Sequence, residues 1–232
     1  MRLLLAPALA LILSACAATG AHDPRDPWEA LNRKTFAFND AVDRAVLKPV
    51  AQGYVNVTTP FIRGRVSNFF ANLADIKTGL NDVLQGKLPL AINDFGRIVV
   101  NTTFGVGGLW DVASGLGVEK RNEDFGQTLG RWGVPPGPYF VIPLLGPSTA
   151  RDAPARAVDP EYFYSRVIDD DVIAWSLWGL DIVQTRAQLF KAESVVEQAA
   201  LDRYLFIRDA WLDRRRNQVY DGLPPLEDDE AK

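Results

Sequence analysis

The chain has 232 residues, of which 47% are hydrophobic and 23% charged, a composition typical of a folded protein and not of a disordered one. Its formal net charge of -4 argues against a nucleic-acid-binding protein that relies on diffuse positive charge. The one histidine, His22, and the one cysteine, Cys16, both lie near the N-terminus. The usual catalytic and zinc-binding side chains are therefore missing from the region expected to fold, and the sequence predicts neither a cofactor nor a metal site.

The first fifteen residues have the features of an export signal. Arg2 supplies a positive charge, and residues 3–13 form an apolar run that Pro7 interrupts and that is too short to span a bilayer. Residues 13–16 (LSAC) resemble a bacterial lipobox, in which small residues precede a cysteine that is lipidated and becomes the new N-terminus. We therefore expect residues 1–15 to be a lipoprotein signal peptide and Cys16 to carry lipid. In the alternative, an ordinary secretory signal is cleaved elsewhere and Cys16 is an incidental free thiol.

Residues 16–25 follow as a predicted lipidated tether. Ala17, in place of an aspartate, resembles the residue found in Gram-negative lipoproteins that are sorted to the outer membrane. The segment from residue 17 to residue 25 can extend at most about 30 Å, so the folded part is expected to work beside that membrane. An exported protein with no second cysteine has no intramolecular disulfide, and packing alone must hold its core.

A first long helix is predicted from residue 26 onward. Asp26 would cap its N-terminus, Pro27 would take the first helical position, and Glu29 places an acid in the first turn. Apolar residues then recur every three or four positions as one stripe, and Pro49 is expected to end the helix. Further helices are predicted over residues 50–57, 61–84 and 88–101, with a break near Ala74 left open.

The middle of the chain is richer in glycine and proline. Residues 102–117 are predicted to be irregular, and residues 124–132 to form a short helix. Residues 133–147 contain five prolines and must be extended or looped. Residues 139–145 are the one stretch with some strand character, and another short helix is expected after Ser148.

Two more helices are predicted near the C-terminus. Residues 172–180 are apolar around almost the whole circumference of a helix over 170–191, so we expect that helix to be buried on more than one side. Ser194 and Glu197 form a capping box for a last helix that runs to Gln218. Residues 26–218 would then make one mostly helical domain, followed by a disordered acidic tail over residues 219–232.

Two motifs allow alternative interpretations. The glycines of residues 105–108 (GVGG) do not complete a G-x-G-x-x-G phosphate loop, because Trp110 occupies the final glycine position. They permit tight turns, or they line or hinge a ligand path. Trp211 is followed by three arginines, residues 214–216, a pairing expected where a helix meets lipid headgroups, although cations at a helix C-terminus also complement its macrodipole. The wide apolar arcs of the last two helices favour membrane contact.

Several short blocks, read in order, resemble the MlaA/VacJ family: residues 26–33 (DPWEALNR), 101–108 (NTTFGVGG) with 111–113 (DVA), 125–134 (FGQTLGRWGV), and 137–139 (GPY) with 146–148 (GPS) and 151–152 (RD). Each block alone is a weak signal. Four of them in this order behind a lipobox are specific, and the match covers essentially all of the mature domain, from about Asp26 to about Arg216.

The resemblance implies an outer-membrane lipoprotein of Gram-negative bacteria that maintains lipid asymmetry. Such a protein removes mislocalised phospholipids from the outer leaflet, passes them to a soluble periplasmic lipid-binding protein, and associates with a trimeric porin. The implied fold is all-α, a ring of short amphipathic helices that lies in one membrane leaflet around an amphipathic channel. Short helices satisfy their own backbone hydrogen bonds, so they can lie within lipid without spanning it. No covalent chemistry is implied, and the protein is predicted not to be an enzyme.

Few residues stand out as candidates for the site. Candidates for the channel wall or its gate come from the first helix and the glycine loop: Phe36, Phe38, Asn39, Gly105, Gly107 and Gly108. Arg97 and Arg131 could bind a phosphate as bidentate donors. Helix packing, turn geometry or pairing with a carboxylate would explain each of these residues equally well.

Two other functions stay open from the sequence. The chain could be a structural lipoprotein that only scaffolds a porin. It could also be a phospholipid hydrolase that uses carboxylates, or a serine without histidine, because acidic residues such as Asp75, Asp82 and Asp94 are scattered through its centre. Nothing in the spacing of those carboxylates selects a catalytic pair.

Overall fold

The computed structural model describes residues 23–159 and 169–225. The predicted signal peptide, Cys16, most of the tether and the end of the acidic tail lie outside the described residues. The described part is mostly helical with one two-stranded sheet, as the sequence predicts. Its elements are α2 (Glu29–Val42), the π-helix η1 (Asp43–Leu47), α3 (Lys48–Val57), α4 (Pro60–Leu84), α5 (Leu88–Thr103), α6 (Val112–Gly115), α7 (Phe125–Arg131), β1 (Tyr139–Ile142), β2 (Gly146–Thr149), α8 (Asp152–Val158), α10 (Asp171–Gln188), α11 (Phe190–Ala199) and α12 (Arg203–Val219).

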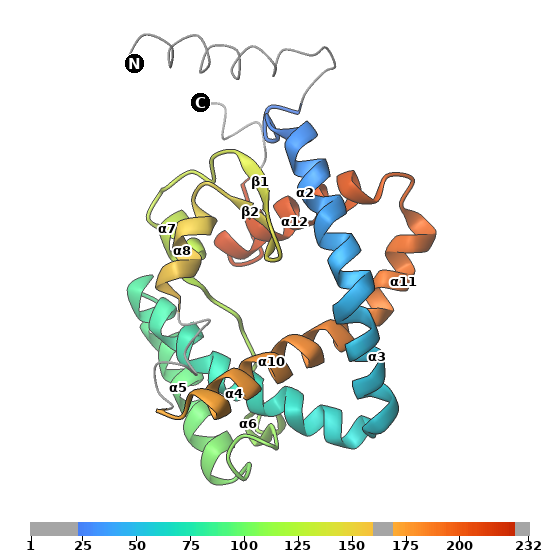
Figure 1. Cartoon of the computed structure of the whole chain (residues 1–232). Helices are drawn as coiled ribbons and strands as arrows, with labels where there is room; N and C mark the ends of the chain where they lie inside the picture. The colour runs from blue at the N-terminus through green and yellow to red at the C-terminus, as the bar shows by residue number, and fades with distance from the viewer. Residues whose placement is uncertain (1–22, 160–168, 226–232) are drawn as a thin grey trace, which may run out of the picture.

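These elements form a ring (Figure 1). The helix α2 continues through η1 into α3, α3 packs against α10, and α10 packs against α4. The circuit then runs from α4 to α7, α8 and β2, and β1 packs back against α2. The helix α5 pairs with α4, while α11 and α12 lead from α10 back to α7. No helix within the described residues has the length and apolar character that crossing a membrane requires.

The start of α2 differs from the prediction. Its N-cap position is Trp28, which makes no capping bond through its side chain. Asp26 is fully buried instead, and its carboxylate accepts hydrogen bonds from Asn32 Nδ2 at 2.7 Å and from the hydroxyl of Tyr204. A buried carboxylate needs several donors, and tertiary neighbours supply them here, so Asp26 links α2 to α12 and is not a helix cap.

The prediction that Pro49 ends the first helix is wrong. The chain stays helical from Glu29 to Val57, and the π-helical segment η1 lies just before Pro49. Proline has no N–H to donate, and the wider turn of a π-helix changes the hydrogen-bond pattern where that donor would be used. The next long helix, α4, is continuous through Ala74, so the break left open there is absent.

The helices α4 and α5 pack together through polar side chains. Asp75 and Asp82 on α4 are fully buried, as are Asp94 on α5 and, almost completely, Arg97. Arg121, from the loop before α7, donates to Asp82 at 2.8 Å and to Asp94 at 2.5 Å. Buried charges require charged or hydrogen-bonding partners. The interior of this helix pair is therefore an ion network and not an apolar core.

The glycine- and proline-rich middle of the chain confirms most of its predictions. Turns connect α5 to α6, and the Asp124 carboxylate caps α7 by accepting from the backbone N–H of Gln127 at 2.9 Å. The strands β1 and β2 form an antiparallel hairpin in which Tyr139 lies opposite Thr149. The short helix expected after Ser148 is α8.

The helix α10 is less buried than the sequence predicts. It packs against α3 and α4 along one face, where Ala174 is buried beside Phe70 of α4. Val172 is 75% exposed and Trp175 is 58% exposed. The expectation of burial on more than one side is therefore wrong for the first turns of α10, whereas residues 177–183 are all half-buried.

The last predicted helix is in fact two helices, α11 and α12, with a break between them at residues 200–202. Asp202 caps α12, since its carboxylate accepts from the backbone N–H of Leu205 at 3.1 Å. Ser194 lies within α11, where its hydroxyl donates to the carbonyl of Lys191, so the predicted capping box is wrong. Serine and aspartate both cap helices well, and tertiary packing decides which of the two is used.

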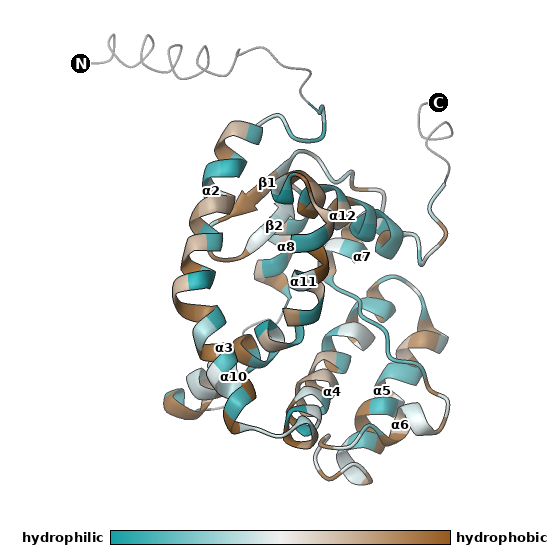
Figure 2. Cartoon of the chain, turned by 90° about the vertical axis from the view of Figure 1, so that its right-hand side faces the viewer, coloured by the Kyte–Doolittle hydropathy of each residue, from teal (hydrophilic) through white to brown (hydrophobic). Residues whose placement is uncertain are grey.

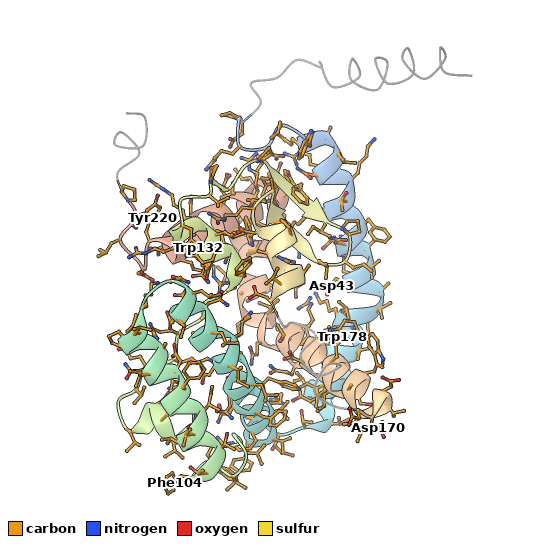
Figure 3. The ribbon with its side chains drawn as sticks, turned by 90° about the vertical axis from the view of Figure 1, so that its left-hand side faces the viewer. Asp43, Phe104, Trp132, Asp170, Trp178 and Tyr220 are labelled. Carbon is orange, nitrogen blue, oxygen red and sulfur yellow. The ribbon has the colours of Figure 1, made fainter. Side chains whose placement is uncertain are left out.

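Burial is distributed unusually for a protein surrounded by water. Among the described residues, buried polar and charged side chains outnumber buried hydrophobic ones by about two to one. Many large hydrophobic side chains are exposed instead, including Leu31, Val57, Phe61, Ile92 and Phe104. Figure 2 shows hydrophobic and hydrophilic residues mixed along most of the helices, and Figure 3 places Phe104 at the end of the α4–α5 pair that lies far from the hairpin. Extensive apolar exposure indicates a surface that meets another apolar medium or partner.

Candidate functional site

Two cavities adjoin each other where α4 meets α7 and α8. The larger one, called the polar cavity here, has a volume of about 400 Å³ and is lined mostly by charged and amide side chains from α4, α7, α8, α12 and the loop before α7. The smaller one, the apolar cavity, has a volume of about 270 Å³ and is lined mainly by Leu80, Val83, Leu84, Phe125 and Val158. Cavities of a few hundred Å³ are typical of ligand sites.

Lys77 and Asp159 line both cavities. Lys77 comes from the middle of α4, and Asp159 follows the last residue of α8. The Asp159 carboxylate accepts hydrogen bonds from the backbone N–H of Phe125 at 2.9 Å and from Asn81 Nδ2 at 3.3 Å. Burial raises the pKa of Asp159, although the bond from Phe125 and the charge of Lys77 oppose that rise. Two charged residues thus lie where the polar and apolar surroundings meet.

Arg215 on α12 organises one side of the polar cavity. Its guanidinium binds Asp124 at 2.5 Å and Asp152 at 2.9 Å, and so ties α12 to α7 and α8. Burial disfavours ionisation of Asp124, but the hydrogen bonds and charge of Arg215 outweigh it and hold the pKa of this carboxyl well below its usual range. The pKa of Asp152 is lowered in the same way against its burial. Both carboxylates are therefore ionised and fully occupied.

Two cations that line the polar cavity, Lys77 and Arg214, form no ion pair with any residue of the described ranges. The remaining acid of the cavity, Glu123, is already engaged: it accepts from Gln85 Nε2 at 2.8 Å and lies 3.5 Å from Lys87 Nζ. Lys77 and Arg214 are therefore two charged groups of the polar cavity that a ligand could bind without breaking an ion pair.

The site offers a polar and an apolar environment side by side. Residues 23–159 and 169–225 contain no histidine or cysteine, and no group of acidic residues among them could hold a metal ion. The carboxylates that line the polar cavity are held by arginines, amides or backbone N–H groups. The arrangement suits a molecule with a charged end and an apolar end, because it offers a separate environment to each.

The three residues predicted on α2 have three different environments, and none of them lines the two cavities. Phe36 packs edge-on against Tyr204, with ring centroids 5.7 Å apart. Phe38 is 52% exposed. The amide of Asn39 holds the hairpin: Nδ2 donates to the carbonyl of Ile142 at 2.9 Å, and Oδ1 accepts from the N–H of Leu144 at 2.7 Å.

The glycines of residues 105–108 serve the turn after α5. Gly105 and Gly108 are buried, and a Cβ atom would overlap the carbonyl oxygen of Trp110 at the first and the side chain of Asn72 at the second. Gly107 is exposed with a φ of 68°, in the left-handed region that favours glycine. The turn geometry alone accounts for these glycines, and a role in a gate stays a prediction.

The two arginines predicted to bind headgroups differ in availability. Arg97 is buried, and its guanidinium donates to Asp75 at 3.2 Å, to Asp111 at 3.0 Å and to Ser114 at 3.1 Å. These bonds occupy its donors, so the structure contradicts a headgroup role for Arg97. Arg131 is exposed in the last turn of α7, and its proposed role stays a prediction.

The aromatic–arginine motif of α12 also turns inward. The ring of Trp211 packs against Tyr139 with centroids 6.0 Å apart, and it borders the polar cavity. Arg215 is occupied by its two aspartates. Trp211 and Arg215 are therefore held within the protein. Arg214 is its exposed member that also lines the cavity.

Sequence reasoning missed Lys77 and Asp159, and singled out Arg214 only as part of a cationic run. One signal was present for Lys77: it shares a helical face with Leu80, Asn81 and Leu84, at spacings of three, four and seven residues. A lone lysine on such a face is typical of many solvated helices. No local pattern links Asp159 to it, because the two are brought together by the packing of α4 against α7 and α8.

Comparison with known proteins identifies the family of this chain. The model of the family described as MlaA lipoprotein matches residues 24–218. The chain belongs to the MlaA lipoprotein family. The short blocks that resemble this family in the sequence therefore identify it correctly.

Named relatives of the MlaA family cover nearly the whole chain. The intermembrane phospholipid transport system lipoprotein MlaA of Escherichia coli is 31% identical over 235 residues, which span 95% of this chain and 90% of that protein. The protein of the same name from Haemophilus influenzae is 31% identical, over 92% of this chain and 90% of that protein. An uncharacterised protein of Rickettsia typhi is 36% identical, over 80% of this chain and 74% of that protein.

A solved structure shares the MlaA fold of this chain. It was described as the structural basis for maintenance of bacterial outer membrane lipid asymmetry, and it superimposes with a TM-score of 0.72 at 31% sequence identity. The match covers 84% of this chain and 98% of the other. The predicted fold class, a ring of mostly helical elements, is thereby confirmed.

Proposed function

We propose that this MlaA family lipoprotein removes mislocalised phospholipids from the outer leaflet of the outer membrane and passes them to a soluble periplasmic lipid-binding protein. The observation that carries the proposal is the meeting of the polar and apolar cavities at Lys77 and Asp159. A phospholipid has a charged headgroup and apolar chains. A purely apolar path would leave the headgroup unsolvated, at a cost of several kcal/mol, whereas the paired cavities serve both ends.

The distribution of burial supports a position within one leaflet. The exposed hydrophobic side chains would meet acyl chains, while buried ion networks and two small apolar clusters keep the helices together. The relatives named for phospholipid transport and the solved structure described for lipid asymmetry support the same function.

Attachment to the membrane and the partners are part of the proposal. Lipidation at Cys16 would anchor the chain in the periplasmic leaflet, where two or more acyl chains hold a protein firmly. A trimeric porin is the proposed neighbour in the membrane. A passive path lets lipid move only down its gradient, so we infer that the periplasmic carrier, by removing lipid, sets the direction.

The test measures clearance of labelled phospholipid from the outer leaflet in cells with the gene, without it, and with a Cys16→Ala variant. We expect clearance to slow without the gene, and the variant to leave the outer membrane. Equal clearance with and without the gene would refute the proposal.

Two controls separate the other functions. If deletion leaves lipid distribution unchanged while the protein still co-purifies with a porin, the chain is a scaffold. If the purified protein releases fatty acid or lysolipid from phospholipid vesicles, it is a hydrolase. We expect neither result.

A further inference from the structure

We propose that Lys77 and Arg214 form a binding subsite for the phosphodiester of a phospholipid whose headgroup carries no compensating ammonium, and that the adjoining apolar cavity takes the first part of an acyl chain. This inference rests on the proposed function and names the lipid class that the path selects. It assigns the selection to a lysine of α4 and an arginine of α12 that line one cavity.

Lys77 and Arg214 are available to bind a phosphate. Neither Lys77 nor Arg214 forms an ion pair within the described residues. The other arginines of the polar cavity are engaged. Arg215 is held by two aspartates, and Arg156 donates to the carbonyls of Leu145 and Pro147. A phosphate oxygen entering the cavity would meet donors without displacing an existing bond.

An ammonium group that enters the polar cavity would meet carboxylates that already accept hydrogen bonds from the protein. The carboxylates of the cavity are all in use: Asp124 and Asp152 by Arg215, Glu123 by Gln85 and Lys87, and Asp159 by the N–H of Phe125 and by Asn81. A headgroup such as ethanolamine would bring a cation beside Lys77 and Arg214, two cations that form no ion pair within the described residues. A headgroup such as glycerol would bring only hydroxyls, which fit among amides and carbonyls.

The position of Lys77 orients the lipid. Lys77 lines both cavities, and on the apolar side its neighbours on α4 are Leu80, Val83 and Leu84. A phosphodiester held at Lys77 places the glycerol backbone at the junction, and the first methylenes then enter the apolar cavity. Its volume of about 270 Å³ is too small for two whole acyl chains, so the rest of the lipid must lie outside it.

The experiment measures which phospholipids the full chain retains. The lipoprotein is purified in mild detergent from cells that contain both phosphatidylglycerol and phosphatidylethanolamine, and the ratio of the two retained lipids is compared with their ratio in the membrane. We expect several-fold enrichment of phosphatidylglycerol. Loss of one charge-assisted hydrogen bond is worth about tenfold in affinity, so Lys77→Gln and Arg214→Gln should each return the ratio to that of the membrane.

Matched variants separate this subsite from general effects. Lys191→Gln removes an exposed lysine of α11, outside the cavities, and should keep the enrichment. Lys77→Arg keeps the charge and should restore most of it. Val83→Asn makes the apolar cavity polar and should lower the total lipid retained while leaving the ratio unchanged. Excess inorganic phosphate should displace little lipid, because a free phosphate lacks the acyl chains.

The results separate this inference from the proposed function. If wild-type protein retains both lipids in the membrane ratio, or if Lys77→Gln with wild-type thermal stability keeps the enrichment, the subsite is wrong, even when clearance in cells is normal. If inorganic phosphate displaces all the lipid, the site binds free phosphate and the inference also fails. Enrichment that depends on Lys77 in a protein whose deletion leaves clearance unchanged would support the subsite and refute the proposed function.

Discussion

The hydroxyl of Tyr204 donates a hydrogen bond to the carboxylate of Asp26, although 178 residues separate them in the chain. Asn32 Nδ2 donates to the same carboxylate and also to the carbonyl of Tyr139. The guanidinium of Arg208 lies 3.3 Å from the Asp26 carboxylate. The start of the folded chain, α2, the hairpin and α12 therefore meet at Asp26. This contact closes one side of the ring with polar bonds, beside the apolar cluster of Tyr139, Val141 and Tyr204.

The first prediction concerns this closure. Tyr204→Phe removes a hydrogen bond to a charged acceptor and should lower the free energy of unfolding by about 1.5–3 kcal/mol. Tyr139→Phe is the matched control, because its hydroxyl is buried in the same cluster with no hydrogen-bond partner in the described part of the chain. That change should be neutral or slightly stabilising. Urea denaturation of both variants in detergent measures the difference, and equal effects would contradict the role given to the Asp26 contact.

The second prediction concerns the amide of Asn39, which holds the hairpin from α2. Asn39→Ala leaves the N–H of Leu144 and the carbonyl of Ile142 without these partners, so stability should fall by about 1–3 kcal/mol. Hydrogen exchange at Leu144 should become faster. Phe38→Ala, one position earlier on an exposed side chain, should leave that exchange rate unchanged. An unchanged rate in Asn39→Ala would show that the hairpin is held by other contacts.

The third prediction compares the two arginines singled out by sequence. Arg97→Gln leaves Asp75 and Asp111 with fewer buried partners and should destabilise the fold by about 3–5 kcal/mol. Arg131→Gln changes an exposed side chain and should cost less than about 0.5 kcal/mol. Chemical denaturation and protein abundance in cells report both. Similar stability of the two variants would mean that the ion network of α4 and α5 is not required for folding.

The fourth prediction is a pH dependence that arises at Asp94. This carboxyl lies between α4 and α5 and faces Asp82, Asp75 and Arg121. Burial and the neighbouring carboxylate of Asp82 raise the pKa of Asp94 to about 7, against the charge of Arg121. The unfolded chain releases this proton near pH ~4. Between these values the folded state binds more protons, so the stability contributed by Asp94 is present at low pH and declines as pH rises toward about 7.

Asp94→Asn should remove this decline. The free energy of unfolding is measured at about pH 5 and at about pH 8. Between these two pH values the wild-type protein should lose more stability than the variant. Asp213→Asn, an exposed aspartate on α12, is the control and should keep the wild-type dependence. A variant at Asp94 with the full wild-type decline would show that other groups cause it.

Local patterns in the sequence predict most of the helices. Proline and glycine positions place α4, α5 and α7 within a few residues, because they act on the backbone of their immediate neighbours. Errors arise where tertiary contacts compete with a local signal. Asp26 has the sequence of a helix cap but is used as a buried acceptor, and Pro49 continues a helix through a π-helical turn.

The site was harder to predict than the fold for a physical reason. Phe36 and Arg97 have the residue types expected of a lipid or phosphate contact. In the structure, however, Phe36 packs against Tyr204 and Arg97 donates to Asp75. Lys77 and Arg214 are ordinary cations in the sequence. They become notable because the packing of α4, α7, α8 and α12 places them on the wall of a cavity without an ion pair within the described residues.

The sequence by itself determined the predicted lipobox, the helical class and the family, because each depends on residues close together in the chain or on short blocks in a fixed order. Only the tertiary structure decided which charges are neutralised and which face the cavities, and that buried polar side chains outnumber buried hydrophobic ones in the described residues. Ion pairs depend on distances in space, and the spacing of residues along the chain does not encode the distance between α4 and α12.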